Sequence, residues 1–144
     1  MSKPTIAIAC DHAGFGLKTH LRKTLEGFAD SVIDLGTNST DSVDYSDYAN
    51  ALAKVIASGK ANMGVLICGS GIGISIAANR HKFIRAALCH NKETAMLARQ
   101  HNDANVLCLG ARVTDEKAAI ECVKAFFSTE FEGGRHARRV EKLG

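Results

Sequence analysis

The chain has 144 residues, of which 46% are hydrophobic, and a formal net charge of +3 at pH 7. This length predicts a single domain, residues 1–144, with enough apolar residues to bury a core and no room for a second domain. The small positive excess gathers near the carboxyl end, so we expect a phosphate-sized partner and neither nucleic acid nor a membrane.

The cysteines and the amino terminus indicate the compartment. The number of cysteines is five, and no two have CxxC spacing, so we expect free thiols, a reducing compartment and no structural metal site. The first residues lead into an apolar strand without a signal-peptide pattern, and we therefore expect a cytoplasmic protein.

Short apolar runs alternate with amphipathic segments along the whole chain. We expect strands at 5–9, 31–35, 63–68, 85–89 and 106–109. We expect helices after Gly14, at about 46–58, after the glycines at 69–73, at 92–100 with Asn91 as N-cap, and after an N-cap at Thr114; a short basic helix follows Gly134.

This alternation predicts the α/β class: a three-layer, doubly wound, Rossmann-like or flavodoxin-like sheet of five parallel strands with a short C-terminal basic helix. In such sheets a ligand lies beyond the carboxyl ends of the strands. Polar residues follow these ends, namely Asp11 and His12, the loop 36–45, Cys68 with its glycines, His90 and Arg112.

The stretch 63–79 carries the strongest chemical signal. An apolar run ends at Cys68, and glycines follow at 69, 71 and 73 before residues that can begin a helix. Such glycines let backbone N–H groups converge beside the positive end of the helix, which suits an anion. The sequence alone leaves open that the glycines serve only a sharp bend and that Cys68 is an inert thiol.

Three phosphate-binding motifs are excluded at this turn. The spacing is GxGxG rather than the GxGxxG of dinucleotide sites, and no acidic residue follows the next strand. A Walker A loop would need Gly-Lys-Ser or Gly-Lys-Thr where the chain has 74–76. Cysteine phosphatases need an arginine where this chain has Ile74.

What remains is a thiolate base beside an uncharged anion cradle. That pair suits proton abstraction next to a carbonyl, because the enediolate intermediate needs both a base and preorganised donors for its oxyanion. A helix N-terminus generally lowers the pKa of a thiol from about 8.5 toward neutrality.

A second polar group lies at the other edge of the sheet. His101 and Asn102 come after a helix and before a strand. If they are catalytic, the simplest geometry is a two-fold dimer in which the cleft of one subunit faces His101 of the other. Arg135 and Arg139 are spaced i, i+4 and can address one phosphate from one helix face. An ordinary polar turn and a solvated basic tail remain open alternatives.

Six blocks together resemble the type B ribose-5-phosphate isomerases, across nearly the full chain and in family order: Cys10-Asp11-His12-Ala13-Gly14, Asp44-Tyr45, Cys68-Gly69-Ser70-Gly71-Ile72-Gly73, Arg99-Gln100-His101-Asn102-Asp103, Gly110-Ala111-Arg112 and Glu132 to Arg139. The resemblance implies a metal-free, cofactor-free aldose–ketose isomerase that interconverts ribose 5-phosphate and ribulose 5-phosphate in the pentose phosphate pathway. It also implies a dimer or tetramer with active sites at subunit interfaces.

The resemblance also implies roles for individual residues. Cys68 would be the base, Ser70 a hydroxyl that orients or polarises beside it, and His101 of a partner subunit the acid that opens the ring. Asp11 would be a further catalytic residue. The implied substrate-binding residues are Asp11, His12, Tyr45, Gly69, Ser70, Gly71, Ile72, Gly73, Asn102, Arg112, Arg135 and Arg139.

Two other functions remain open on the sequence. Galactose-6-phosphate and allose-6-phosphate isomerases are similar, so the substrate could have six carbons. A non-catalytic flavin or phosphate-ligand binder is the alternative from another class, although it leaves the thiol in the turn unexplained. The sequence does not distinguish dimer from tetramer, does not say which subunit supplies each arginine, and suggests His136 only as a neighbour of the phosphate.

Overall fold

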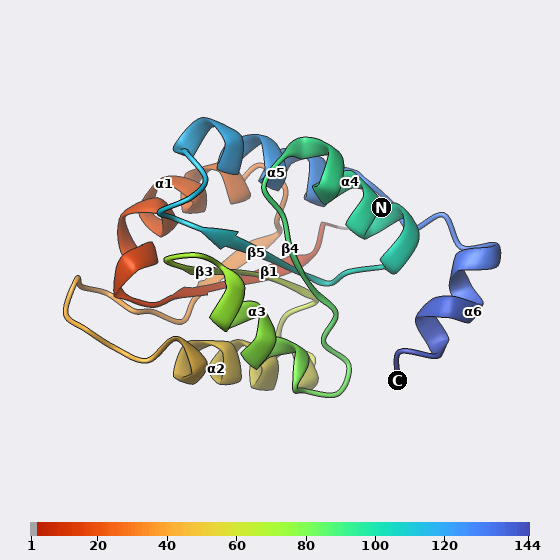
Figure 1. Ribbon diagram of the computed structural model, residues 1–144, viewed down its shortest axis with the longest axis horizontal. Coiled ribbons are helices and arrows are strands. Elements are labelled where there is room, and N and C mark those ends of the chain that lie inside the picture. The colour runs from red at the N-terminus through yellow and green to blue at the C-terminus, as the bar shows by residue number, and fades with distance from the viewer. Residues whose placement is uncertain (1–2) are drawn as a thin grey trace.

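The computed structural model describes residues 3–144 and consists of a parallel sheet between two layers of helices (Figure 1). The strands are β1 (Thr5–Cys10), β2 (Ser31–Asp34), β3 (Met63–Cys68), β4 (Ala86–Leu88) and β5 (Val106–Gly110). The helices are α1 (Phe15–Leu25), α2 (Tyr45–Ala57), α3 (Ile72–Asn79), α4 (Lys92–Asn102), α5 (Glu116–Ser128) and α6 (Arg135–Glu141), with a 3-10 turn, η1 (His12–Gly14), before α1. None of the helices in this described part of the chain has the length and apolarity to cross a bilayer.

The predicted α/β class is confirmed, and the strand order adds a detail that the sequence did not predict. The order is β2-β1-β3-β5-β4, whereas a flavodoxin sheet runs 2-1-3-4-5. β5 takes the inner place because all five of its residues are buried, while β4 has three half-buried residues that suit an edge. The chain reverses direction across the sheet between β1 and β3, which places the topological switch point at their carboxyl ends.

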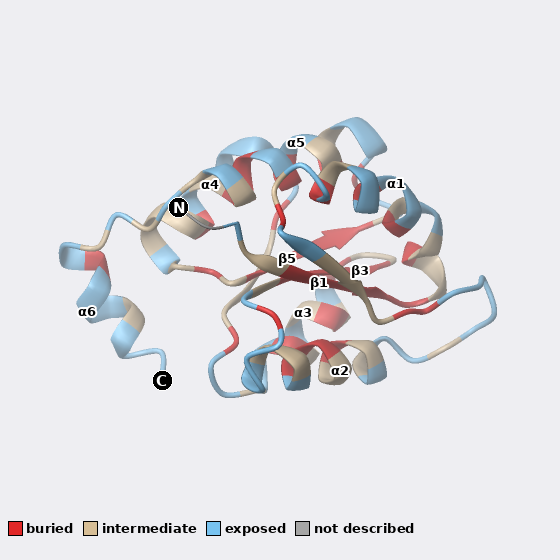
Figure 2. Cartoon of the chain, turned by 180° about the vertical axis from the view of Figure 1, so that it is seen from behind, coloured by how far each residue is buried: buried red, intermediate tan, exposed pale blue. Residues whose placement is uncertain are grey.

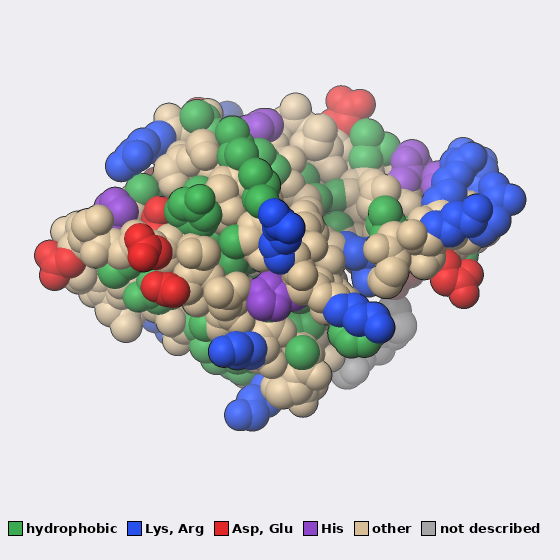
Figure 3. Space-filling model, turned by 60° about the horizontal axis from the view of Figure 1, so that its bottom comes forward, with side chains coloured by type: hydrophobic (Ala, Val, Ile, Leu, Met, Phe, Trp, Pro, Cys, Tyr) green, Lys and Arg blue, Asp and Glu red, His purple; other side chains and the backbone are tan. Residues whose placement is uncertain are grey.

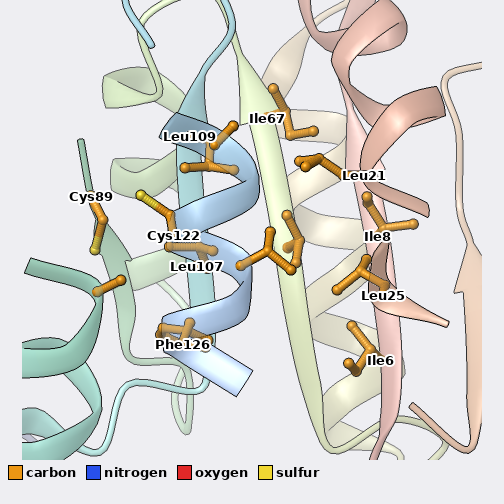
Figure 4. Close-up of a cluster of buried hydrophobic side chains, with 14 of the residues drawn as sticks. Ile6, Ile8, Leu21, Leu25, Ile67, Cys89, Leu107, Leu109, Cys122 and Phe126 are labelled. Atoms are coloured by element: carbon orange, nitrogen blue, oxygen red, sulfur yellow. The ribbon is translucent and has the colours of Figure 1, made fainter. Parts of the chain in front are cut away.

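Alternation along the strands divides the core into two clusters. Ile6 and Ile8 of β1 face α1, α4 and α5, where they pack with Leu21 and Phe126 (Figure 4). Ala7 and Ala9 point to the opposite side, in the cluster that contains Leu52 of α2 and Ile74 of α3. Figure 2 shows the inner strands β1, β3 and β5 buried and the outer helix faces exposed, so the sheet is a rigid base for the loops at its edges.

The boundaries of two helices differ from the sequence prediction. α4 continues through His101 and Asn102 and ends at Asp103, which adopts a left-handed conformation with φ of 47°. Asn91 caps this helix as predicted, since its side chain accepts a hydrogen bond from the amide of Thr94. Both candidate site residues therefore lie in the last helical turn rather than in a separate loop.

The predicted N-cap of α5 is wrong by one residue. The cap is Asp115, whose Oδ1 accepts the amide of Ala118 over 2.8 Å. Thr114 instead belongs to the preceding turn, where its amide bonds the carbonyl of Gly110. Among the buried side-chain nitrogen and oxygen atoms of residues 3–144, its hydroxyl oxygen is the one with no hydrogen-bond partner.

A buried lysine fastens the loop that follows β2. Lys18 is 1% exposed, and its Nζ lies 2.7 Å from Asp34 Oδ1 and 2.7 Å from the carbonyl oxygen of Thr37. The amide of Thr37 in turn bonds the carbonyl of Cys10. The ammonium group thus ties α1, β2 and the start of the loop to the end of β1.

We expect Lys18→Met to lower the free energy of unfolding by about 2–3 kcal/mol, because it leaves a carboxylate and a buried carbonyl without their donor. Urea denaturation would measure the loss. Lys23→Met on the exposed side of the same helix is the control and should change stability by less than about 0.5 kcal/mol. Equal losses in both variants would show that the buried network contributes nothing.

Candidate active site

A cleft of about 410 Å³ opens at the carboxyl ends of β1, β3 and β5, at the topological switch point. Larger hollows exist elsewhere, but this one collects the side chains that follow strand ends, as the rule for α/β sheets predicts. Its lining consists of Asp11, Tyr45, Cys68, Gly69, Ser70, Gly73, Arg112 and Val113. Seven of these were expected from the sequence; Val113 was not, because an apolar residue after a polar turn gives no signal.

The glycine turn holds the thiol of Cys68 in a defined position. Cys68 is the last residue of β3 and is 4% exposed, and its Sγ accepts a hydrogen bond from the amide of Gly71 over 3.2 Å. Gly71 has a φ of 79°, and a Cβ there would lie 2.5 Å from Leu88 Cδ1, so only glycine fits. A backbone donor therefore points at the sulfur and stabilises negative charge on it.

The other four cysteines lie away from the cleft. Burial raises the pKa of Cys10, Cys89 and Cys122 to about 11 and raises that of Cys108 further. These thiols stay protonated near pH 7 and act as small apolar core residues. Cys68 is the one cysteine that lines the cleft.

Side-chain oxygens accept hydrogen bonds from backbone amides at the beginnings of two helices, α3 and η1. Ser70 Oγ accepts the amide of Ile72 over 3.1 Å, at the beginning of α3. Asp11 Oδ1 accepts the amides of Ala13 and Gly14 over 3.0 and 3.2 Å, and the residue is nearly buried. The hydroxyl and the carboxylate are thus fixed at the rim of the cleft, close to the sulfur.

His12 and Tyr45 are positioned through the loop before α2. The amide of Val43 donates to His12 Nδ1 over 3.1 Å, so this nitrogen carries a lone pair and the neutral ring bears its proton on Nε2. Tyr45 begins α2 and lies against Gly73: a Cβ on that glycine would be 2.6 Å from Tyr45 Cζ. The absence of a side chain at Gly73 lets the phenol ring close over the cleft.

The turn after β5 brings a guanidinium group to the same cleft. The amides of Ala111 and Arg112 bond the carbonyls of Cys68 and Gly69, both over 2.9 Å. The Arg112 side chain lies along Gly69, where a Cβ would be 3.0 Å from Nη1. One positive charge therefore stands beside the thiol turn in every copy of the chain.

Four predicted site residues lie elsewhere. His101 and Asn102 end α4 at the amino edge of the sheet, and Arg135 and Arg139 lie exposed on α6. In Figure 1 this end of the molecule is opposite the loop that follows β2. Figure 3 shows Lys and Arg side chains gathered there beside His side chains. A single chain thus holds two separate groups of candidate residues.

The group at the amino edge includes Glu132, which the sequence did not single out, and His136, which it suggested only as a neighbour of the phosphate. His101, Glu132 and His136 place their ligand atoms within 4.8 Å of one another, and they are the one such trio of metal-binding side chains in the described residues, 3–144. The two imidazole rings stack almost in parallel, with an interplanar angle of 12°. Parallel rings direct their lone pairs side by side rather than toward one tetrahedral centre, so this geometry does not suit Zn²⁺.

Comparison with known proteins agrees with the fold. Residues 6–143 match the family described as Ribose/Galactose Isomerase. Ribose-5-phosphate isomerase B of Escherichia coli is 46% identical over 138 residues, which are 96% of this chain and 93% of that protein. The solved structure of ribose-5-phosphate isomerase B from Clostridium thermocellum has 46% identity and a TM-score of 0.94, covering 97% of this chain and 95% of that one. The structure of the Thermotoga maritima ribose 5-phosphate isomerase has 49% identity and a TM-score of 0.93, covering 97% of both chains.

These relatives show that the chain is an isomerase built on a doubly wound sheet, and the structure places a thiol in a glycine turn at the switch point. The chain belongs to the ribose/galactose isomerase family, as its resemblance to the type B ribose-5-phosphate isomerases predicted. Membership in a family of enzymes decides against the alternative of a non-catalytic flavin binder.

Proposed function

We propose that the protein interconverts D-ribose 5-phosphate and D-ribulose 5-phosphate through a cis-enediolate, as in the non-oxidative pentose phosphate pathway. The observation that carries the proposal is the Cys68 thiol, held by the Gly71 amide inside a cleft that Arg112 also lines. The names of the relatives, at 46–49% identity, support the five-carbon substrate. The free thiols of all five cysteines are compatible with the cytoplasm.

Cys68 is the base of the proton transfer. Its thiolate takes the proton from C2 of the open-chain aldose, the electron pair forms the C1–C2 double bond, and negative charge develops on O1. The proton returns from the sulfur to C1 while the hydrogen of O2 passes to O1, so that O2 becomes the ketone oxygen and O1 a hydroxyl. No atom is gained or lost overall, and the sulfur is regenerated.

The turn around Cys68 also supplies stabilisation for the oxyanion. Ser70 carries a hydroxyl whose oxygen already meets the Ile72 amide, which leaves its hydrogen free to donate to a substrate oxygen. The backbone from Gly69 to Gly73 surrounds the sulfur and begins α3, where the helix dipole favours negative charge. Asp11, which lines the cleft, and its neighbour His12 bind sugar hydroxyls.

Ring opening is assigned to His101 of a second copy, because the His101 of the same chain lies at the far edge of the sheet. The acid gives a proton to the ring oxygen as the bond from that oxygen to C1 breaks. The C1 hydroxyl gives its proton to solvent water as the C1 carbonyl forms, and solvent returns a proton to the acid. Ile72 and Ile76 of α3 lie beside the cleft four residues apart and are 54% and 56% exposed, which supports a subunit contact there.

The phosphate is bound from both copies. Arg112 reaches it from the chain that supplies Cys68. Arg135 and Arg139 share a face of α6 near His101, so a second copy that delivers His101 also delivers these guanidinium groups and Asn102. A homodimer, or a tetramer made of such dimers, is the assembly that this division of residues requires.

The decisive test compares kcat/KM for ribose 5-phosphate with values for six-carbon aldose 6-phosphates, all with the unmodified protein. We expect the five-carbon substrate to be favoured by at least about tenfold, because the extra carbon displaces either C1 or the phosphate from its partners. Preference for a six-carbon phosphate would correct the substrate, and no turnover of any aldose phosphate would refute the isomerase assignment.

Gly73→Ala is expected to raise KM for ribose 5-phosphate about five- to tenfold with little change in stability. The added methyl group would meet the far end of the Tyr45 side chain at 2.6 Å, and that ring is already 44% exposed, so it swings out of the cleft at low cost. Steady-state kinetics measure the change. The control is Gly16→Ala on α1, where no atom lies within 4 Å of the added carbon. An unchanged KM in Gly73→Ala would show that Tyr45 does not contact the substrate.

A further inference from the structure

Three titratable side chains meet where the end of α4 faces the beginning of α6. The His101 and His136 rings stack with their centroids 4.2 Å apart. Glu132 Oε1 lies 3.8 Å from His101 Nε2 and 3.7 Å from His136 Nε2. Both distances exceed a hydrogen bond but allow close ionic attraction. The Glu132 carboxylate is therefore close to both imidazole rings at the same time.

We infer that Glu132 and His136 are positioning residues for His101: the Glu132 carboxylate, 3.8 Å from Nε2, orients the His101 ring, and His136 fixes the plane of that ring by stacking. The inference rests on the proposed role of His101 as the ring-opening acid, and it gives a function to two residues outside the cleft. Neither of them needs to touch the sugar.

The charges around His136 favour this division of roles. Burial lowers the pKa of His136, and three positively charged neighbours lower it further, namely His101, Arg135 and Arg139, while Glu132 acts in the opposite direction. These effects favour the neutral form of His136. Two stacked imidazolium ions would repel each other, so the negative charge of Glu132 is available to the more exposed ring, His101.

The backbone around the trio is fixed independently of these side chains. The amide of Glu132 bonds the carbonyl of Gln100 over 3.1 Å, next to His101 in the chain. Arg99 joins the same two segments: its Nε donates to the carbonyl of Thr129, and its Nη1 donates to Asp103 Oδ1 over 2.9 Å. The carboxylate is thus held against the end of α4 by the backbone, which is the arrangement that a preorganised acid requires.

The ketose substrate allows the ring-opening role of His101 to be measured separately from the roles of the other site residues. A five-carbon aldose phosphate is a closed furanose and needs an acid to open it. The ketose has its carbonyl at C2 and its C5 oxygen esterified, so it cannot form a furanose and is always open. Exchange of a C1 hydrogen of the ketose with solvent therefore needs the base but not the ring-opening acid.

The test is Glu132→Gln, which keeps the shape and removes the charge. We expect kcat from ribose 5-phosphate to fall about tenfold with KM changed less than about twofold, while deuterium exchange at C1 of ribulose 5-phosphate in D₂O stays within about twofold. Glu130→Gln makes the same change two residues earlier, at an exposed side chain, and should leave both rates unaltered. His136→Ala should also slow only the aldose reaction, and His136→Phe, which restores a stacked ring, should recover it.

The outcomes are distinguishable. Normal aldose turnover in Glu132→Gln, or equal loss of turnover and exchange, would overturn the positioning role. Absence of both reactions in the unmodified protein would instead refute the proposed function, and the positioning role with it.

Discussion

Replacing Cys68 with alanine is expected to lower kcat for isomerisation at least about a thousandfold while the fold and phosphate binding remain intact. Among residues 3–144 its sulfur is the only one that lines the cleft, and the Gly71 amide that donates to it over 3.2 Å would lose its acceptor. Alanine occupies the start of the turn without an atom that can take a proton. Both aldose turnover and deuterium exchange at C1 of the ketose should disappear together, because both need the base.

Cys122→Ala is the matched control for this loss. Cys122 is fully buried in α5, and burial raises its pKa to about 11, so it stays protonated at neutral pH. Its replacement should reduce stability by about 1 kcal/mol and leave kcat near that of the unmodified protein. Near-normal turnover in Cys68→Ala would remove the base from the proposed mechanism and direct attention to Asp11.

The sequence could predict the class of fold because alternation of strands and helices is a local pattern. It could not predict the order of β4 and β5, since both begin as short apolar runs and their places depend on how much of each the helices cover. It misplaced the cap of α5 for a similar reason. Thr114 and Asp115 are both good caps, and the choice depends on a turn closed by the Gly110 carbonyl.

The cleft was more predictable than the amino edge. Residues after parallel strands must meet at one edge, so Asp11, Cys68 and Arg112 could be grouped from the sequence alone. The stack of His101 on His136 could not, because 35 positions separate the two residues in the chain and only the path of the segment after α5 brings them together. The i, i+4 spacing of Glu132 and His136 was a usable signal that the neighbouring arginines obscured.

The candidate residues are divided between two edges of the sheet, and this division predicts that two inactive variants can restore activity to each other. If each site takes Cys68 from one copy and His101 from another, Cys68→Ala and His101→Ala homodimers both lack one essential residue at every site. A heterodimer of the two variants has one site with both residues intact and one site with neither. Mixing two inactive proteins should therefore restore activity.

Equal amounts of the two variants, after complete subunit exchange, should recover about a quarter of the unmodified kcat per subunit, because half of the random dimers are heterodimers and each has one working site in two. The measurement is aldose turnover against time after mixing, with exchange verified by mass spectrometry of differently labelled subunits. Mixing Cys68→Ala with Ser70→Ala is the matched control: both changes fall in the same cleft, so the site without the thiol stays dead and the other keeps only the Ser70→Ala activity. Full exchange without recovery in the first mixture would show that His101 acts within its own chain or not at all. Recovery near a quarter requires that each cleft be completed by the amino edge of a neighbouring subunit.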